Sequence, residues 1–289
     1  MVEVRCLVRA HATLGEGPLW DARRATLWWV DIKRPTLHRY HPATGRHVAV
    51  APSTRVTALA LDRAGRLVAS GDGGLGLLDP ESGRFTLTVP LEGEPATNRF
   101  NDGKADARGD FWAGTMDDGE GGTAAGAVYR FAAAGGVARI ADGFRVPNGP
   151  AFDSAGRMYL ADSALRTIYR YPADAPGETA RRAPFLVLRD DQGYPDGMTC
   201  DAEDHLWVAC WDGRCVRRVA PDGAIVAEVR VPAQRPTSCT FGGPGLTTLY
   251  VTSARVGLDE AALAGQPDAG GLFAFAPGVR GVAAATFGG

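Results

Sequence analysis

The sequence has no long apolar run, no excess of charge and no segment that looks like an export signal. No segment approaches the roughly 20 apolar residues that a helix needs to cross a bilayer. The first nine residues alternate as in a strand and contain no apolar signal region. A net charge of −2 at pH 7 provides no basic patch for nucleic acid and no polybasic membrane tether. We therefore expect a cytoplasmic protein that binds a small molecule, with no nucleic-acid or membrane partner and no evident obligate protein partner.

Cysteine and histidine are scarce, with five residues of each. The cysteines are odd in number and form no C-x-x-C pair; they are Cys6, Cys200, Cys210, Cys215 and Cys239. This pattern predicts small apolar fillers in a reducing cytosol rather than a zinc site or disulfides. No serine lies in a nucleophile-elbow pattern, so a hydrolytic triad has little support and metal-assisted chemistry remains.

Long helical periodicity is also absent, apart from a possible helical turn or two near residues 259–264. This absence excludes alternating strands and helices, and with them a doubly wound parallel sheet. Glycine (38 residues) and proline (19 residues) are frequent instead. Such a composition is expected where many short strands need many turns.

Six short apolar strands recur along the chain, each after a turn-forming segment. They begin 40 to 48 residues apart and occupy Leu27–Val30, Leu67–Ser70, Phe111–Gly114, Met158–Ala161, Leu206–Ala209 and Leu249–Thr252. A second segment in each repeat, such as Leu37–Pro42 or Ile168–Pro172, predicts a third strand that closes into a hairpin. Repeats of about 40–50 residues suit the four-stranded blades of a propeller.

The repeat predicts an all-β fold, a six-bladed β-propeller, formed by residues 1–289 as a single domain. A chain of 289 residues could form two ordinary domains, but propellers of this size also fold as one. A β-sandwich is the alternative all-β fold. A sandwich would not require the same sequence pattern to recur six times at similar intervals.

One position keeps a constant distance from the turn in all six repeats. The turn residues are Asp21, Asp62, Asp106, Asp153, Asp201 and Gly242. Five residues before each of them the chain carries a polar side chain, and we call these six the register positions: Glu16, Thr57, Asn101, Asn148, Asp196 and Thr237. The next residue is small in every repeat except the third, which has Asp102, and small residues suit crowded innermost strands. A closed array brings equivalent positions together on its axis, so we expect these six to line a central channel.

Three of these register positions offer oxygen ligands for a metal ion in that channel. Glu16 and Asp196 supply carboxylates and Asn148 an amide oxygen, a set that suits a hard divalent ion. Three protein ligands leave coordination positions open for water and substrate. Taken singly, each is also an ordinary turn residue. The shared register favours the metal site.

A further polar segment, residues 99–104, lies in the third repeat. It is either a solvated loop or, because Asn101 holds the register position, part of the channel, where Arg99 and Asn101 would contact a polyhydroxylated ligand. Asp102 and Lys104 are expected to pair or brace locally. The acidic loop 116–122 is either solvated surface or a lip over the channel mouth, with one carboxylate that contacts substrate hydroxyls.

At these residues the chain resembles the SMP-30/gluconolactonase/regucalcin family of six-bladed propellers. The matching segments run from the first repeat to the last: Leu14–Trp20, Arg99–Lys104, Phe111–Met116, Pro147–Gly149, Pro195–Met198 and Thr237–Gly243. Trp28–Lys33 and His41–Gly45 look like bacterial members that act on pentono- or hexonolactones.

The resemblance implies hydrolysis of a sugar lactone to an aldonic acid with one divalent ion, whether Ca²⁺, Zn²⁺, Mn²⁺ or Fe²⁺. It assigns metal binding to Glu16, Asn148 and Asp196, and substrate binding to Arg99 and Asn101. It also implies that an acidic residue after Met116 contacts substrate; Glu120 is our choice over Asp117 and Asp118.

The expected mechanism is lactone ring opening, with the ion as Lewis acid at the carbonyl and Asp196 as general base on the attacking water. Two alternatives stay open. One is an aryl-ester or organophosphate hydrolase on the same scaffold. The other is a non-catalytic propeller that binds calcium or a sugar acid, although such a calcium site would favour more protein oxygens.

Overall fold

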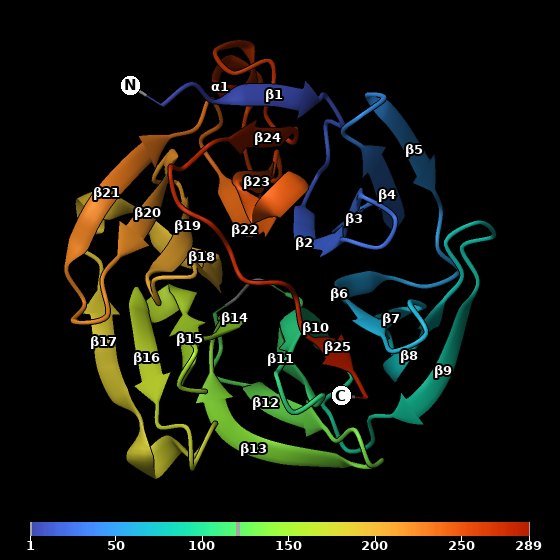
Figure 1. Ribbon diagram of the computed structural model, residues 1–289. Helices are drawn as coiled ribbons and strands as arrows, with labels where there is room; N and C mark the ends of the chain where they lie inside the picture. The colour runs from blue at the N-terminus through green and yellow to red at the C-terminus, as the bar shows by residue number, and fades with distance from the viewer. Residues whose placement is uncertain (1, 120–121, 289) are drawn as a thin grey trace.

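The computed structural model describes residues 2–119 and 122–288, whose strands form six sheets around a common centre (Figure 1). Each sheet is a blade of four antiparallel strands, and the second blade has one further strand. The first three blades comprise β2 (Gly15–Asp21), β3 (Thr26–Asp31), β4 (Thr36–His41) and β5 (Arg46–Val50); β6 (Val56–Asp62), β7 (Leu67–Gly71), β8 (Gly74–Leu78) and β9 (Phe85–Pro90); and β10 (Asn98–Ala105), β11 (Phe111–Asp117), β12 (Gly126–Phe131) and β13 (Val137–Phe144).

The remaining three blades complete the ring. They comprise β14 (Pro147–Phe152), β15 (Met158–Asp162), β16 (Thr167–Tyr171) and β17 (Ala183–Val187); β18 (Tyr194–Cys200), β19 (Leu206–Trp211), β20 (Cys215–Val219) and β21 (Ile225–Arg230); and β22 (Pro236–Gly242), β23 (Thr248–Ser253), β24 (Leu272–Phe275) and β1 (Arg5–Val8). The predicted all-β, six-bladed propeller is confirmed.

The six predicted apolar strands are the second strands of the blades. Every residue of β3 and β7 is buried, whereas β21, at the outer edge of its blade, is mostly exposed. Second strands pack between neighbouring blades, so they need continuous apolar runs instead of alternation. The apolar core accordingly lies between the blades, in clusters such as Ala58, Val68, Phe100 and Phe111, which joins the second and third blades.

Buried aspartates shape the turns between the first and second strands of the blades. Asp106 Oδ1 accepts hydrogen bonds from the amides of Arg108 and Asp110 at 2.9 and 3.0 Å, and its Oδ2 accepts from Trp112 Nε1 at 2.9 Å. Asp201 has the same arrangement with Trp207. A carboxylate that bonds its own turn stabilises the turn conformation. These hydrogen bonds explain why aspartate recurs at the turn residue in the first five repeats.

Both ends of the chain close the ring. β1 pairs antiparallel with β24, so the N-terminal strand completes the sixth blade. Residues 276–288, which we call the strap, cross the centre of the face seen in Figure 1. Gly281 of the strap bridges to Asp201 in the fifth blade, and strand β25 (Thr286–Phe287) pairs in parallel with β6 in the second. These contacts join blades that are distant in sequence.

Helices are short in the described part of the chain. The α-helix α1 (Glu260–Ala264) starts at Asp259, whose side chain accepts from the amide of Ala262 at 2.8 Å. Single 3₁₀ turns are η1 (Ser163–Leu165), η2 (Thr179–Arg181), η3 (Asp190–Gln192) and η4 (Pro244–Leu246). With α1 only five residues long, no helix in residues 2–119 and 122–288 has the length or apolar content for a membrane span.

The innermost strands pack closely around the centre. Gly197 of β18 lies against β22, and a Cβ atom at this position would overlap the side chain of Ser238. The backbone of β18 therefore approaches β22 so closely that only glycine fits at position 197. This agrees with the small residues predicted after the register positions.

We expect the substitution Gly197→Ala to lower the free energy of unfolding by about 1–3 kcal/mol, because the added methyl group forces β18 and β22 apart. Urea-induced unfolding measures this change. Gly265→Ala is the matched control, since the nearest atom to its added Cβ is 3.6 Å away and its φ of −79° suits alanine. Equal stability of Gly197→Ala and wild type would contradict the close packing.

Candidate active site at one end of the channel

The six register residues all lie on innermost strands and are all buried. Their exposed fractions are 5% for Glu16, 2% for Thr57, 8% for Asn101, 3% for Asn148, 5% for Asp196 and 0% for Thr237. At or beside each of them the pairing with the second strand shifts register. Such bulges turn a side chain away from the regular alternation. They explain how polar residues can face a channel from strands whose other residues build the core.

A cavity of about 440 Å³ brings the predicted site residues together. Its lining includes Glu16, Arg99, Asn101, Asn148 and Asp196, which come from four different blades. A volume of this size is in the range of small-molecule sites. Thr57 and Thr237, the two other register residues, are not among the described residues that line it. The predicted metal and substrate residues other than Glu120 thus share one cavity, and their chemical roles stay predictions.

Two buried carboxylates face this cavity without a cationic partner. Glu16 accepts a hydrogen bond from the amide of Gly17 at 3.1 Å, and Asp196 accepts one from the amide of Gly197 at 3.0 Å. Among the described residues neither carboxylate forms an ion pair with lysine or arginine. Burial raises the pKa of both groups well above the usual range, and the nearby charges of Asp196 and Asp102 raise that of Glu16 further.

Burying two like charges is unfavourable, and the nearby charge of Arg99 offsets only part of this cost. Within residues 2–119 and 122–288, no group of three or more His, Cys, Asp or Glu side chains is placed to hold a metal. The predicted set differs from such a cluster because its third member, Asn148, is an amide.

A directed chain of hydrogen bonds orients that amide. Arg99 Nη1 donates to Asn101 Oδ1 at 2.8 Å, and Asn101 Nδ2 donates to Asn148 Oδ1 at 3.0 Å. Asn148 Nδ2 then donates to Ser163 Oγ at 2.8 Å, and Ser163 Oγ donates to the Pro195 carbonyl at 2.5 Å. A guanidinium can only donate and a carbonyl can only accept, so the two ends fix the orientation of both amides. Asn148 Oδ1 keeps one lone pair for a further partner.

Arg99 is held at the cavity by Asp118. Its Nε donates to Asp118 Oδ1 at 2.8 Å, and Asp118 also pairs with Arg55 at 2.6 Å and Lys33 at 3.2 Å. Burial disfavours the charge of Asp118, but hydrogen bonds from Arg55 and Lys33 outweigh this effect and lower its pKa to about 2. Asp118 is therefore ionised at neutral pH and links the first three blades.

The other acidic residues of that loop are placed differently. Asp117 bonds within its own loop, to the amide of Gly119 at 3.0 Å and to the Thr123 hydroxyl at 2.9 Å. Glu120, the predicted substrate contact, lies outside the described residues. Its role stays a prediction.

Asp102 and Lys104 act as braces between blades. Asp102 accepts from the amide of Gly149 in the fourth blade at 2.9 Å, and Lys104 donates to the Met198 carbonyl in the fifth at 2.6 Å. Among the described residues no ion pair joins the two, so of the two expected roles only bracing is seen.

Several lining residues had not been expected, and three of them share a spacing. Met116, Ser163 and Trp211 each come 15 residues after a register position, at the end of the neighbouring second strand, and all three line the cavity. The spacing of 15 residues could therefore have been used to predict these three residues from the sequence. Asp212 and Arg235 also line the cavity and pair at 2.7 Å, with the guanidinium 4.7 Å from the ring centre of Trp211. No spacing in the sequence indicates that contact.

Fold and site together define a class of protein, a six-bladed propeller with a carboxylate-rich pocket at one end of its channel. A family model described as SMP-30/Gluconolactonase/LRE-like region matches residues 14–255. The chain therefore belongs to the SMP-30/gluconolactonase family, as its motifs predicted.

Named relatives of known class support this assignment. An L-arabinolactonase of Azospirillum brasilense is 39% identical over 288 residues, which cover 98% of this chain and 95% of that protein. A pentonolactonase of Haloferax volcanii is 36% identical over 276 residues, or 92% of each chain. The crystal structure of regucalcin from Agrobacterium tumefaciens, described as a calcium-binding protein, has a TM-score of 0.92 at 33% identity and covers 99% of this chain and 97% of that chain. Family and relatives confirm the predicted enzyme class, a gluconolactonase-like hydrolase.

The raised pKa values predict an unusual pH dependence for the metal-free protein. Aspartate in an unfolded chain has a pKa of about 3.9, so between that value and the raised folded value the folded state binds more protons than the unfolded state. The free energy of unfolding should then fall as pH rises through this window. Asp196→Asn removes one such group and should stabilise the metal-free protein at pH 7, because the variant no longer buries an ionised carboxylate.

Thermal unfolding in the presence of a chelator, from pH 5 to pH 8, measures both effects. The melting temperature of wild type should decline towards pH 8, and that of Asp196→Asn should decline less. If Asp196→Asn were less stable than wild type at pH 7, the surroundings would not destabilise the ionised form of Asp196.

Proposed function

We propose that the protein hydrolyses a sugar lactone, a pentono- or hexonolactone, to the aldonic acid with the help of one divalent metal ion. The observation that carries this proposal is the meeting of two unpaired buried carboxylates and an oriented amide oxygen in a small-molecule cavity. The named lactonases among its relatives support the substrate class.

The residues present fit a hard divalent ion. Glu16, Asn148 and Asp196 offer oxygen atoms only, and calcium and similar hard ions prefer such ligands. A bound ion would neutralise the two carboxylates, which removes the reason for their raised pKa values. When bound, it would supply a Lewis acid for the lactone carbonyl. Its identity among Ca²⁺, Zn²⁺, Mn²⁺ and Fe²⁺ is left to experiment, because oxygen ligands in open sites accept each of them.

The chain's own residues would position the substrate and move the proton. Asp196 would accept a proton from the attacking water, and Glu16 and Asn148 would hold the site's geometry. Among the described residues the Nη2 group of Arg99 has no acceptor, so its two N–H donors are available for ring hydroxyls. Asp118 keeps this guanidinium in place, which lowers the entropic cost of orienting the lactone.

The second candidate is a non-catalytic binding protein. The regucalcin of Agrobacterium tumefaciens is described as calcium-binding, and the acidic pocket here would suit calcium. The two functions differ in proton release, because only hydrolysis converts a neutral lactone into an acid that ionises.

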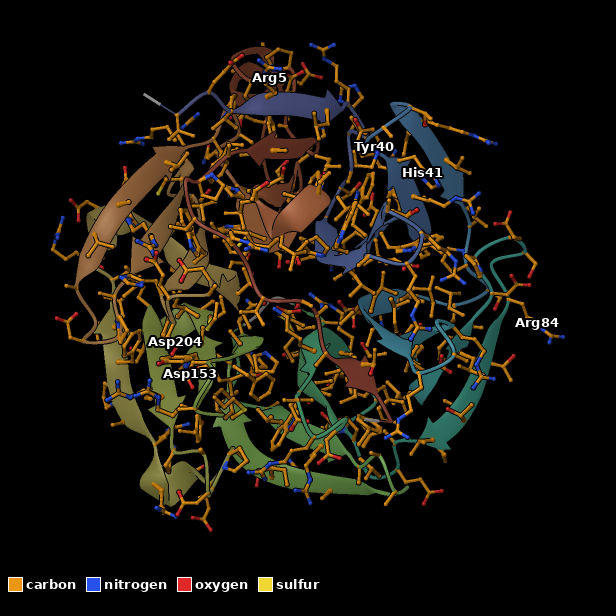
Figure 2. The ribbon with its side chains drawn as sticks, in the orientation of Figure 1. Arg5, Tyr40, His41, Arg84, Asp153 and Asp204 are labelled. Atoms are coloured by element: carbon orange, nitrogen blue, oxygen red, sulfur yellow. The ribbon has the colours of Figure 1, made fainter. Side chains whose placement is uncertain are left out.

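We expect sugar lactones to acidify a weakly buffered solution of the enzyme, and a chelator to stop this acidification until a divalent ion is restored. Asp196→Asn should lower kcat/KM by at least about 100-fold, a typical loss when a general base is removed. Asp204→Asn is the matched control; Asp204 bonds Ser154 near Asp153, on the face crossed by the strap (Figure 2), and should leave turnover unchanged. Full activity of a folded Asp196→Asn protein would refute the assignment.

The same assay separates the remaining alternatives. Metal binding without proton release would favour the binding protein. A strong preference for phenyl acetate or a phosphotriester over lactones would favour the aryl-ester or organophosphate hydrolase.

A further prediction concerns the positioning of Asn148. Ser163→Ala removes the acceptor for Asn148 Nδ2, so the amide can rotate and metal affinity should fall about 10-fold, as is usual when a residue that orients a ligand is lost. Isothermal titration calorimetry with Ca²⁺ or Mn²⁺ measures the change. Ser253→Ala is the control, because Ser253 is also buried but bonds the Gly271 carbonyl and does not line the cavity. Unchanged affinity in Ser163→Ala would show that the chain of hydrogen bonds does not orient the ligand.

We further propose that residues 1–289 form one domain and that the protein is cytoplasmic. Both proposals rest on the sequence pattern.

A further inference from the structure

Two cysteines outside the proposed mechanism lie opposite each other in the fifth blade. Cys210 ends the pairing of β19 with β20, and its partner across the strands is Cys215. Directly opposed residues in antiparallel strands have Cα atoms about 4.5–5.5 Å apart. A disulfide requires about 4.4–6.8 Å. The backbone thus already meets the main condition for a bond between these side chains.

The surroundings favour a thiolate at Cys215, whereas the hydrogen bond with Cys215 and then burial raise the pKa of Cys210 well above its usual range. Arg217 Nη1 lies 3.1 Å from Cys210 Sγ, and Arg217 as a whole is only 5% exposed. The hydrogen bond from the Cys210 thiol lowers the pKa of Cys215, and the charge of Arg217 adds to this effect. The three other cysteines differ from Cys215, because burial raises their pKa, to about 11 for Cys6 and to about 12 for Cys239.

The pair also borders the candidate active site. The four-residue loop that joins the two cysteines includes Trp211 and Asp212, which line the cavity. On the other side of β19, Cys210 pairs with Pro195, the residue before Asp196. A bond between Cys210 and Cys215 would therefore act on the cavity wall and on the strand that carries Asp196.

We propose that Cys210 and Cys215 are a redox-sensitive pair, which a small hydroperoxide converts to a cross-strand disulfide that alters the active-site wall. The Cys215 thiolate attacks one peroxide oxygen, takes it up as a sulfenic acid, and the other oxygen leaves as water after protonation. The Cys210 sulfur then attacks the sulfenic sulfur and displaces a second water, with its own proton leaving on that oxygen. Two thiols and one hydrogen peroxide thus give one disulfide and two waters.

This bond would be a switch rather than a structural staple. It closes a loop of only six residues, and a short loop restricts the unfolded chain little. Both cysteines are fully buried and pack against Leu186 and Leu188, so the oxidant must be small. A hydroperoxide fits this condition, whereas a bulky disulfide such as oxidised glutathione does not.

The test treats the folded, metal-loaded protein with increasing hydrogen peroxide and then maps its thiols by alkylation, digestion and mass spectrometry. We expect the peptides that contain Cys210 and Cys215 to lose two hydrogen atoms and resist alkylation before Cys200 or Cys239 reacts. Lactone kcat/KM should fall about 10-fold in parallel and recover with dithiothreitol, because a shift of about 1 Å at an active site can cost up to about 100-fold.

Two variants make the result specific. Cys215→Ser cannot form the bond and should keep its activity in peroxide. Cys200→Ser is the matched control, because Cys200 is also buried but lies opposite a leucine, and this variant should respond like wild type. If Cys215→Ser does not fold, reversal by dithiothreitol in wild type carries the same information. A pair that stays reduced while other cysteines oxidise would overturn the proposal, as would a disulfide that leaves both turnover and amide exchange of residues 211–214 unchanged.

Only the turnover readout rests on the proposed lactonase function. If the protein proves not to be a lactonase, disulfide mapping and amide exchange in the loop still decide whether the redox pair exists.

Discussion

The burial of two carboxylates away from water at the centre of the ring is the constraint on which the rest of the structure depends. Glu16 and Asp196 come from the first and fifth blades, and both face one cavity with raised pKa values. Such an arrangement survives only if the surrounding frame is too rigid to let the groups separate or reach solvent. It is also the basis of the proposed chemistry, because a bound cation would relieve the cost of burying these charges.

The frame meets this demand through features that act between blades. Bulges in the innermost strands turn the register residues towards the channel. Turn aspartates such as Asp106 and Asp201 stabilise the turns at which these strands end. Strand β1 and the strap then tie together blades that are distant along the chain. Since each blade packs only on its neighbours, closure is what converts six separate sheets into one rigid ring.

Much of the site was predictable because it repeats with the fold. Glu16, Asn148 and Asp196 could be found by counting from a turn residue, and a second offset of 15 residues would have added Ser163 and Trp211. The link between Asn101 and Asn148 could not be found in this way, since it joins side chains of different blades. The same holds for the ion pair of Asp118 with Arg99 and for the facing of Cys210 and Cys215, which the sequence suggested were mere apolar fillers.

The sequence by itself determined the number of blades, the strands that build them and the polar residues that recur in register, because local periodicity and turn chemistry specify where strands begin and end. Only the tertiary structure decided which of those residues meet, which way the amide of Asn148 points and which acidic residue holds Arg99. The physical reason is that these contacts cross between blades. They exist only after the ring has closed and the bulges have turned the side chains inward.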